Sequence, residues 1–286
     1  MVNQNQTSSS FQLRAENVSK IVTGFALQEY VFKQLLVVES SSAWKETYFE
    51  EKSEDLTASA SRNIKGVGRF SEPPYVETQF TEKSGRHLKY MDQTRISWED
   101  ALTNDVDVVR RHLLRLARAI SKAVDDTIYS ALSDNAGSST ASTGAWDTGT
   151  PKIITDIAVA KRKIAVFNYN PDRGGFLLLS PKDFESLYIE LVETRGASIP
   201  AFSSEAVTNG KVMTINNLTV LVSNSVTADE ALVVVSKEVG TWKSVQNLTT
   251  ETIRDPGIKW TIRSWEIGQV QITNPNAIAK ITNTQN

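Results

Sequence analysis

The chain of 286 residues has no cysteine and only two histidines, and its charges nearly balance, with 31 lysines and arginines against 33 aspartates and glutamates. The absence of cysteine excludes disulfides, thiolate metal sites and cysteine nucleophiles. The near-neutral charge gives no global argument for a nucleic-acid-binding surface. We therefore expect any contact with nucleic acid to be local.

Long apolar runs are also missing. No run of about 18 apolar residues occurs, and the first ten residues lack the basic and apolar regions of a signal peptide. The sequence therefore predicts neither a membrane span nor secretion. Its 40% hydrophobic and 22% charged residues are typical of an ordinary globular protein.

Motifs that would carry catalysis are absent too. His87 and His112 lie apart without the spacing of metal ligands, so we expect structural or surface roles for both. No phosphate-binding loop or nucleophile elbow occurs, and residues 151–239, where an enzyme site could be housed, contain neither histidine nor cysteine. We predict no catalytic residue, no cofactor and no metal site, and thus no enzyme.

The most regular pattern present is a long amphipathic helix within residues 97–132. Glycine and proline are absent from this stretch. Apolar residues recur at spacings of three and four, at Leu102, Val106, Val109, Leu113, Leu116, Ile120, Val124 and Ile128. Ser97 with Asp100 resembles a capping box, and Thr103 and Asn104 offer a second start, so we expect a short helix, a break and a longer helix.

Two groups of charged residues occur in this helical stretch. The basic residues from Arg110 to Lys122 could contact phosphate groups, or they could form a solvated helix face. Asp125 and Asp126 are adjacent, so their side chains point about 100° apart and do not share a site. For this pair we expect a solvated or subunit-facing role.

The length of the helix restricts the architecture. Residues 105–132 would span roughly 40 Å at about 1.5 Å per residue, whereas a compact chain of this length has a radius of gyration of about 19 Å. A coiled coil, a helical bundle or a flat, elongated subunit would accommodate such a helix.

The remaining segments show distinct patterns. Residues 11–38 form a second amphipathic helical pattern, and residues 40–96 alternate as strands in extended hairpins with few apolar residues. Residues 136–150 are small, polar and glycine-rich, which predicts a flexible loop. Residues 153–240 alternate helices and strands as in a mixed α/β domain, and residues 240–281 return to strands.

This order of elements resembles the major capsid proteins of tailed bacteriophages and archaeal tailed viruses, which share the Hong Kong ninety-seven type fold. The stretch Ile96-Ser-Trp-Glu-Asp-Ala-Leu with Asn104-Asp105 looks like the lead-in to the spine helix of that family, and Asp125-Asp126-Thr-Ile-Tyr resembles the end of that helix. Residues 270–281 look like its final strand and closing Pro-x-Ala-Ile phrase.

The resemblance implies an α+β fold with four parts. Residues 1–42 would be an N-terminal arm, and residues 43–95 an extended β-hairpin loop. Residues 96–150 and 240–286 would form a peripheral domain with the spine helix, and residues 151–239 a mixed α/β axial domain.

The same resemblance implies a structural function. Copies of the chain would assemble into hexamers and pentamers of an icosahedral shell that encloses double-stranded DNA with at most local contact. Scaffold, portal and decoration proteins are further possible partners, no membrane is involved, and the shell would form in the host cytoplasm as part of the virion. The alternative is an encapsulin-like nanocompartment shell, which the sequence separates poorly from a virus.

Subunit contacts are then expected on the arm and on the extended loop. A protruding hairpin with few apolar residues would be completed by a neighbouring subunit, and its charges would pair across the contact. The expected contact residues are Lys52, Lys65, Arg69, Glu72 and Arg86 of the loop and Phe25 and Phe32 of the arm.

Overall fold

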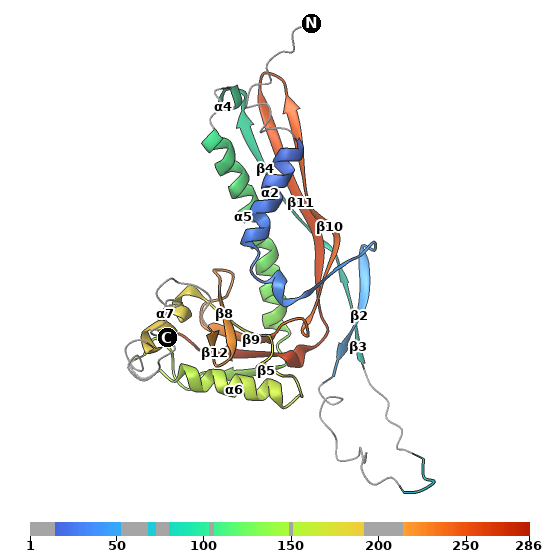
Figure 1. Cartoon of the computed structure of the whole chain (residues 1–286), viewed down its shortest axis with the longest axis vertical. Coiled ribbons are helices and arrows are strands. Elements are labelled where there is room, and N and C mark those ends of the chain that lie inside the picture. The colour runs from blue at the N-terminus through green and yellow to red at the C-terminus, as the bar shows by residue number, and fades with distance from the viewer. Residues whose placement is uncertain (1–14, 53–67, 73–79, 103–105, 149–150, 192–213) are drawn as a thin grey trace.

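The computed structural model describes residues 15–52, 68–72, 80–102, 106–148, 151–191 and 214–286. Its helices are α2 (Ala15–Glu29), α4 (Trp98–Leu102), α5 (Val106–Asp134), α6 (Ile153–Ala165) and α7 (Pro181–Ile189), with the short 3-10 helices η1 (Lys33–Leu35) and η4 (Pro275–Ala277). The elements form an elongated body in which α5 runs along the long axis (Figure 1).

Strands are distributed over three sheets. A four-stranded sheet has the order β1 (Val37–Ser40), β10 (Gly240–Asp255), β11 (Lys259–Ile272) and β4 (Leu88–Ser97). A six-stranded sheet has the order β5 (Ser138–Ala141), β12 (Ile278–Thr282), β9 (Glu230–Val235), β6 (Gly175–Leu179), β8 (Leu218–Val222) and β7 (Thr214–Ile215). A separate ribbon pairs β2 (Lys45–Glu51) with β3 (Phe80–Arg86).

The spine helix α5 joins two hydrophobic cores. Its amino-terminal half packs with α2 against β4 and β11, where Leu113, Leu116 and Ala117 meet Val22 and Ile262. Its carboxyl-terminal half belongs to a much larger core, in which residues such as Ile128 and Leu132 join the buried side chains of the six-stranded sheet. The predicted apolar positions from Val109 to Ile128 are thus buried.

The predicted start of the helix is confirmed. Trp98 to Leu102 forms the short helix α4, and the Ser97 hydroxyl accepts a hydrogen bond from the Asp100 backbone N–H at 3.0 Å. The predicted break lies at residues 103–105, outside the described residues, and the long helix resumes at Val106.

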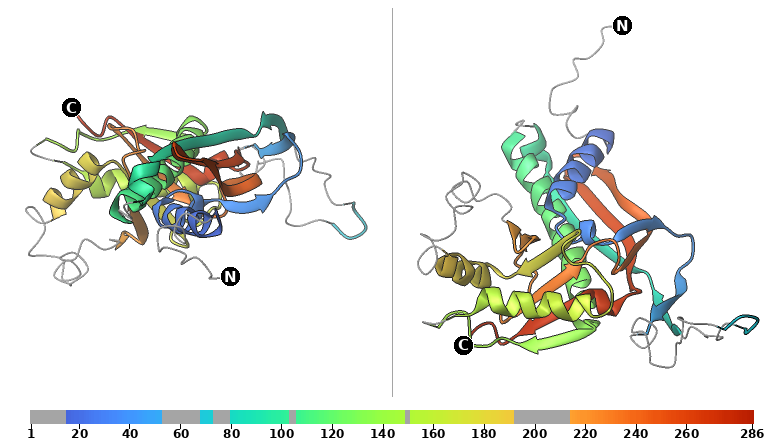
Figure 2. Two further views of the ribbon diagram at one scale, coloured as in Figure 1. Left: turned by 90° about the horizontal axis from the view of Figure 1, so that it is seen from above. Right: turned by 60° about the horizontal axis from the view of Figure 1, so that its bottom comes forward.

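The prediction of a flexible loop over residues 136–150 was wrong for its middle part. Ser138–Ala141 forms β5, which pairs in parallel with β12, and α6 packs against both strands (Figure 2). Trp146 is buried, and its indole N–H donates to Asp156 Oδ2 at 3.1 Å. The small, polar composition hid a strand whose partner lies far away in the sequence.

The mixed α/β segment largely follows the sequence prediction. Helices α6 and α7 and strands β6, β8 and β9 lie where the pattern placed them, and Ser180 caps α7 by accepting from the Asp183 backbone N–H. In the tail, β10 and β11 pair over most of their length, with irregular register between Ser244 and Thr249. Strand β4 pairs with β11 over its whole length, so residues 88–97 lie in the four-stranded sheet.

Candidate assembly surfaces

The β2–β3 ribbon projects from the body and exposes aromatic side chains (Figure 1). Trp44 is 63% exposed, Phe49 59% and Phe80 54%. The rings of Phe49 and Phe80 meet edge to face with centroids 6.3 Å apart. A two-stranded ribbon has no core of its own, and clustered exposed aromatic side chains mark interaction sites. The face with Phe49 and Phe80 is therefore suited to packing on another protein surface, and Trp44, just before β2, exposes a further aromatic ring.

The ribbon is bound to the body by polar contacts at both ends of β2. The Glu51 backbone N–H donates to Thr273 O at 2.9 Å, and the Glu51 carboxylate accepts from the Tyr169 hydroxyl at 2.6 Å. Burial, with the neighbouring Glu51 carboxylate, raises the pKa of Tyr169, so the phenol stays a donor. The Gln271 side chain donates to Glu46 at 3.0 Å. These contacts thus hold β2 beside the body.

The charged residues predicted as loop contacts fall partly on this ribbon. Arg86 is exposed at the end of β3, where it pairs in register with Lys45, and Lys52 is half-buried just after β2. Arg69 and Glu72 are exposed in the described piece 68–72, and Lys65 lies outside the described residues. The structure contains one subunit, so their contacts with a neighbour stay predictions.

The two arm residues differ in accessibility. Phe25 is half-buried on α2, with the Arg110 guanidinium 5.9 Å from its ring centroid. Phe32 is fully buried, and its ring lies 6.1 Å from that of Tyr129. In this conformation Phe32 fills the core of its own subunit. Of the two predicted arm contacts, Phe25 is the one with accessible surface.

A buried polar cluster fixes the arm to the spine helix. The carboxylate of Asp125 accepts from the backbone N–H groups of Val31 at 2.9 Å and Phe32 at 3.2 Å. Burial raises the pKa of Asp125 to about 6, although these two hydrogen bonds oppose the shift. The predicted solvated or subunit-facing role was therefore wrong for Asp125, whereas Asp126 is half-exposed and pairs with Lys122 at 2.8 Å.

Residues that no sequence signal indicated complete this cluster. Glu266 on β11 is 2% exposed and accepts from the Tyr30 hydroxyl and from the Lys33 ammonium, each at 2.5 Å. Lys33 also lies 3.6 Å from the centroid of the Tyr30 ring. Burial lowers the pKa of Lys33, and burial together with Glu266 raises that of Tyr30. Arm, spine helix and β11 are thus held at one point.

Neither histidine belongs to a candidate metal site in the described part of the chain. The described part of the chain contains no group of three or more histidine, aspartate or glutamate side chains that could hold a metal ion. His87 is buried beside the ribbon, and the half-buried His112 is bonded through Nδ1 to Thr94 Oγ1 at 2.9 Å. No helix in the described ranges is long and apolar enough to cross a membrane.

Solved structures of viral shells have a similar fold. The capsid of the cyanophage P-SCSP1u matches with a TM-score of 0.66 and 12% identity, covering 90% of this chain and 89% of that one. The virus-like particle from Pyrococcus furiosus matches with a TM-score of 0.62 and 12% identity over 93% of this chain and 98% of that one. Mycobacterium phage Ogopogo gives 17% identity, a TM-score of 0.58, and coverage of 89% and 92%.

Sequence comparison gives the family. No curated protein matches the chain significantly. A family model described as phage capsid protein matches residues 82–281, which include β4, the spine helix and most of β12. The fold is therefore the predicted α+β fold of the Hong Kong ninety-seven type, and the chain belongs to the phage capsid protein family as a structural protein of the virion shell.

Proposed function

We propose that copies of this chain form the hexamers and pentamers of an icosahedral shell that encloses double-stranded DNA and assembles in the host cytoplasm. Membership of the phage capsid protein family supports the shell. The observation that carries the mode of assembly is the β2–β3 ribbon, which exposes Trp44, Phe49 and Phe80 outside any core of its own subunit.

The ribbon would lie on a neighbouring subunit and bury these aromatic side chains there. Arg69, Glu72 and Arg86 are exposed, and together with Lys52 and Lys65 they would pair with charges of the neighbour. Phe25, half-buried on α2, would add a contact from the arm. Rim charges of this kind affect specificity and association rate more than affinity.

The four-part division is proposed with adjusted borders. The arm is 1–42 and the extended loop 43–87, because β4 from Leu88 onward pairs with β11. The peripheral part then holds 88–135 and 240–272. The axial part holds 136–239 and 273–286, because β5 and β12 are strands of the six-stranded sheet.

Electron microscopy and light scattering of the full chain, expressed alone and with its neighbouring genes, test this proposal. Closed shells, or rings of five and six subunits, are the expected result, and the need for a scaffold, portal or decoration protein follows from which genes are required. A strictly monomeric species under all conditions would contradict the proposal.

A nanocompartment shell is the second candidate, because the similar structure from Pyrococcus furiosus is described as a virus-like particle. Such a shell would contain a cargo protein in place of a genome. Purified particles from the native host that contain double-stranded DNA support the viral function, whereas particles filled with one co-purifying protein support the nanocompartment.

A further inference from the structure

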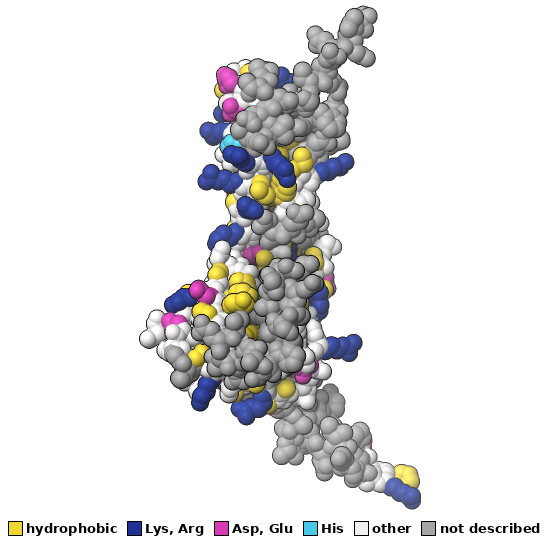
Figure 3. Space-filling model, turned by 60° about the vertical axis from the view of Figure 1, so that its left-hand side comes forward, with side chains coloured by type: hydrophobic (Ala, Val, Ile, Leu, Met, Phe, Trp, Pro, Cys, Tyr) yellow, Lys and Arg dark blue, Asp and Glu magenta, His cyan; other side chains and the backbone are white. Residues whose placement is uncertain are grey.

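One face of the spine helix carries a stripe of basic side chains, which we call the α5 basic stripe. Its members are all exposed and follow each other at spacings of four, three and four residues: Arg111, Arg115, Arg118 and Lys122. At about 100° per residue these positions fall within roughly 60° of one another. Leu113, Leu116 and Ile120 are buried on the opposite face of the helix. Figure 3 shows Lys and Arg side chains projecting along this part of the molecule.

The stripe lacks the acidic residues that usually accompany an exposed helix face. No aspartate or glutamate occurs in the sequence between Val108 and Val124, and Lys122 pairs with Asp126 at 2.8 Å. Like charges three and four residues apart destabilise a helix, and a solvated face normally alternates its signs. The stripe therefore maintains a positive potential over roughly 16 Å, at about 1.5 Å per residue, and this arrangement favours a negatively charged partner.

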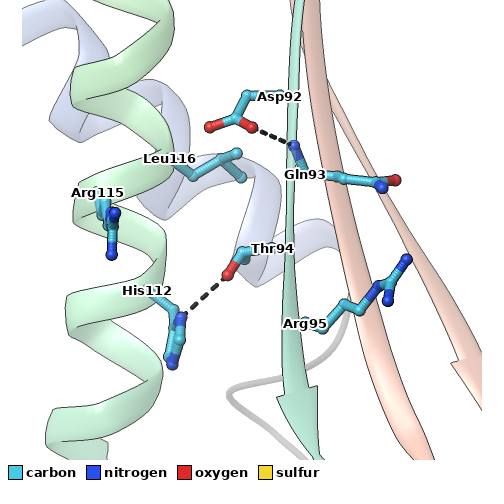
Figure 4. A pocket seen from close by; sticks show the side chains of 7 residues that line it. All are labelled: Asp92, Gln93, Thr94, Arg95, His112, Arg115 and Leu116. Carbon is cyan, nitrogen blue, oxygen red and sulfur yellow. Dashed lines mark hydrogen bonds between the residues drawn. The ribbon is translucent and has the colours of Figure 1, made fainter.

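A groove beside the stripe separates α5 from the neighbouring strand β4. It has a volume of about 460 Å³ and is lined by Asp92, Gln93, Thr94 and Arg95 of β4 and by His112, Arg115 and Leu116 of α5. In Figure 4, Arg115 and His112 stand on the helix side and Arg95 on the strand side. The carboxylate of Asp92 accepts from the Gln93 backbone N–H at 2.8 Å. Asp92 and Thr94 point from β4 toward the helix, whereas Arg95 points away from it, so Arg115 borders the groove from the helix side (Figure 4).

We infer that the α5 basic stripe contacts the phosphate backbone of the enclosed duplex, which places this face of α5 on the inside of the shell. The inference rests on the proposed function, because it assigns the inner face of that shell. Three of the four stripe residues are arginines, whose planar guanidinium groups match phosphate geometry. Duplex DNA carries about one charge per 1.7 Å of its axis, so roughly 16 Å presents about ten phosphate charges to four cations. The contact is local and independent of sequence.

Duplex binding by assembled shells and by subunits released from them tests the inference. A labelled 100-base-pair duplex of arbitrary sequence is titrated by fluorescence anisotropy over a series of KCl concentrations. The test variant is Arg111→Gln/Arg115→Gln. The matched control is Lys152→Gln/Arg173→Gln, which removes two exposed basic residues far from the stripe.

Released wild-type subunits should bind the duplex, and closed shells should not, because the stripe faces inward. The test variant should lose at least tenfold in affinity at low salt, and its slope of log K against log salt should fall by roughly 2, at about 0.9 per lost phosphate contact. The control variant should stay within twofold of wild type.

Three results would overturn the inference while leaving the proposed shell intact. The first is an equal loss of duplex affinity in the test and control variants. The second is duplex binding by closed shells that is as tight as binding by released subunits. The third is stripe-dependent binding of polyglutamate without binding of the duplex, which would indicate an acidic protein partner. If the test variant does not assemble, the comparison of closed wild-type shells with released wild-type subunits still tests whether the stripe faces inward. Failure of the wild-type protein to form any shell contradicts the proposed function itself.

Discussion

The six-stranded sheet and the β2–β3 ribbon use apolar residues in opposite ways. In β9 every residue from Ala231 to Val235 is buried, whereas in β2 the side chains alternate and Phe49 is 59% exposed. The sheet is complete within one subunit, because helices and neighbouring strands cover it. The ribbon is held against the body by polar contacts of Glu46, Glu51 and Lys83, and it leaves the face with Phe49 and Phe80 for a neighbour. One chain thus separates the residues that fold it from those expected to assemble it.

Removal of a buried ring in the sheet region should have the largest effect on the subunit. The Trp146 side chain is 2% exposed and its N–H is bonded to Asp156, so Trp146→Ala should lower the free energy of unfolding by about 3–5 kcal/mol. Chemical denaturation of released subunits measures this loss. Trp44→Ala is the matched control, since that ring is 63% exposed and its removal should change the value by less than about 1 kcal/mol. A similar loss of unfolding free energy in both variants would contradict the distinction between the sheet region and the ribbon.

The joint between arm and spine helix should give an intermediate effect. Asp125→Ala leaves two buried backbone N–H groups without their acceptor and should cost about 2–3 kcal/mol. Asp125→Asn retains one acceptor oxygen and should cost less. Denaturation of both variants beside wild type measures the difference, and equal stability of Asp125→Ala and wild type would contradict the role of the carboxylate.

The same carboxyl group should make stability depend on pH. The pKa of Asp125 is about 6 in the folded subunit, whereas an aspartate in the unfolded chain has the ordinary value of 3.8. Between these two pH values the folded state therefore binds more protons than the unfolded state. The contribution of Asp125 is then fully present below about pH 4 and is lost as the pH rises through 6, with an upper limit of roughly 3 kcal/mol. The stability of wild type minus that of Asp125→Asn, measured from pH 4 to 7, should therefore fall with rising pH. A flat difference would contradict this.

A substitution in the ribbon should have the smallest effect on the stability of the subunit. It should change the assembly of subunits instead. Phe49→Ala removes an exposed ring that contacts mainly Phe80, so the free energy of unfolding should change by less than about 1 kcal/mol. The protein concentration needed for shell formation, followed by light scattering, should rise at least tenfold. Unchanged assembly would show that the ribbon face is not a subunit contact.

Local patterns predicted most of the helices. The spine helix and α6 have apolar residues at helical spacing, and α7 begins at the capping residue Ser180, so the sequence alone could place them. The pairing partners of the strands were not predictable in the same way. Strand β5 has the composition of a loop and is ordered by β12, well over a hundred residues later.

The polar cluster at Asp125 was hidden for the same reason. Tyr30 and Lys33 lie more than 200 residues before Glu266 in the sequence, and only the fold brings each of their polar atoms to 2.5 Å from the Glu266 carboxylate. The α5 basic stripe is different, because its spacing is visible in the sequence. What the sequence could not decide was whether that face is covered, and the structure describes it as exposed.

The position of β12 has a consequence for the order of folding. It lies between β5 and β9 inside the six-stranded sheet, although residues 278–282 are synthesised after every other strand. Until they emerge from the ribosome, β5 has no partner and β9 has an open edge, which is the kind of incomplete sheet that aggregates. Contacts between such distant residues also form slowly. The six-stranded sheet of a nascent chain can therefore be completed only after translation has passed residue 282.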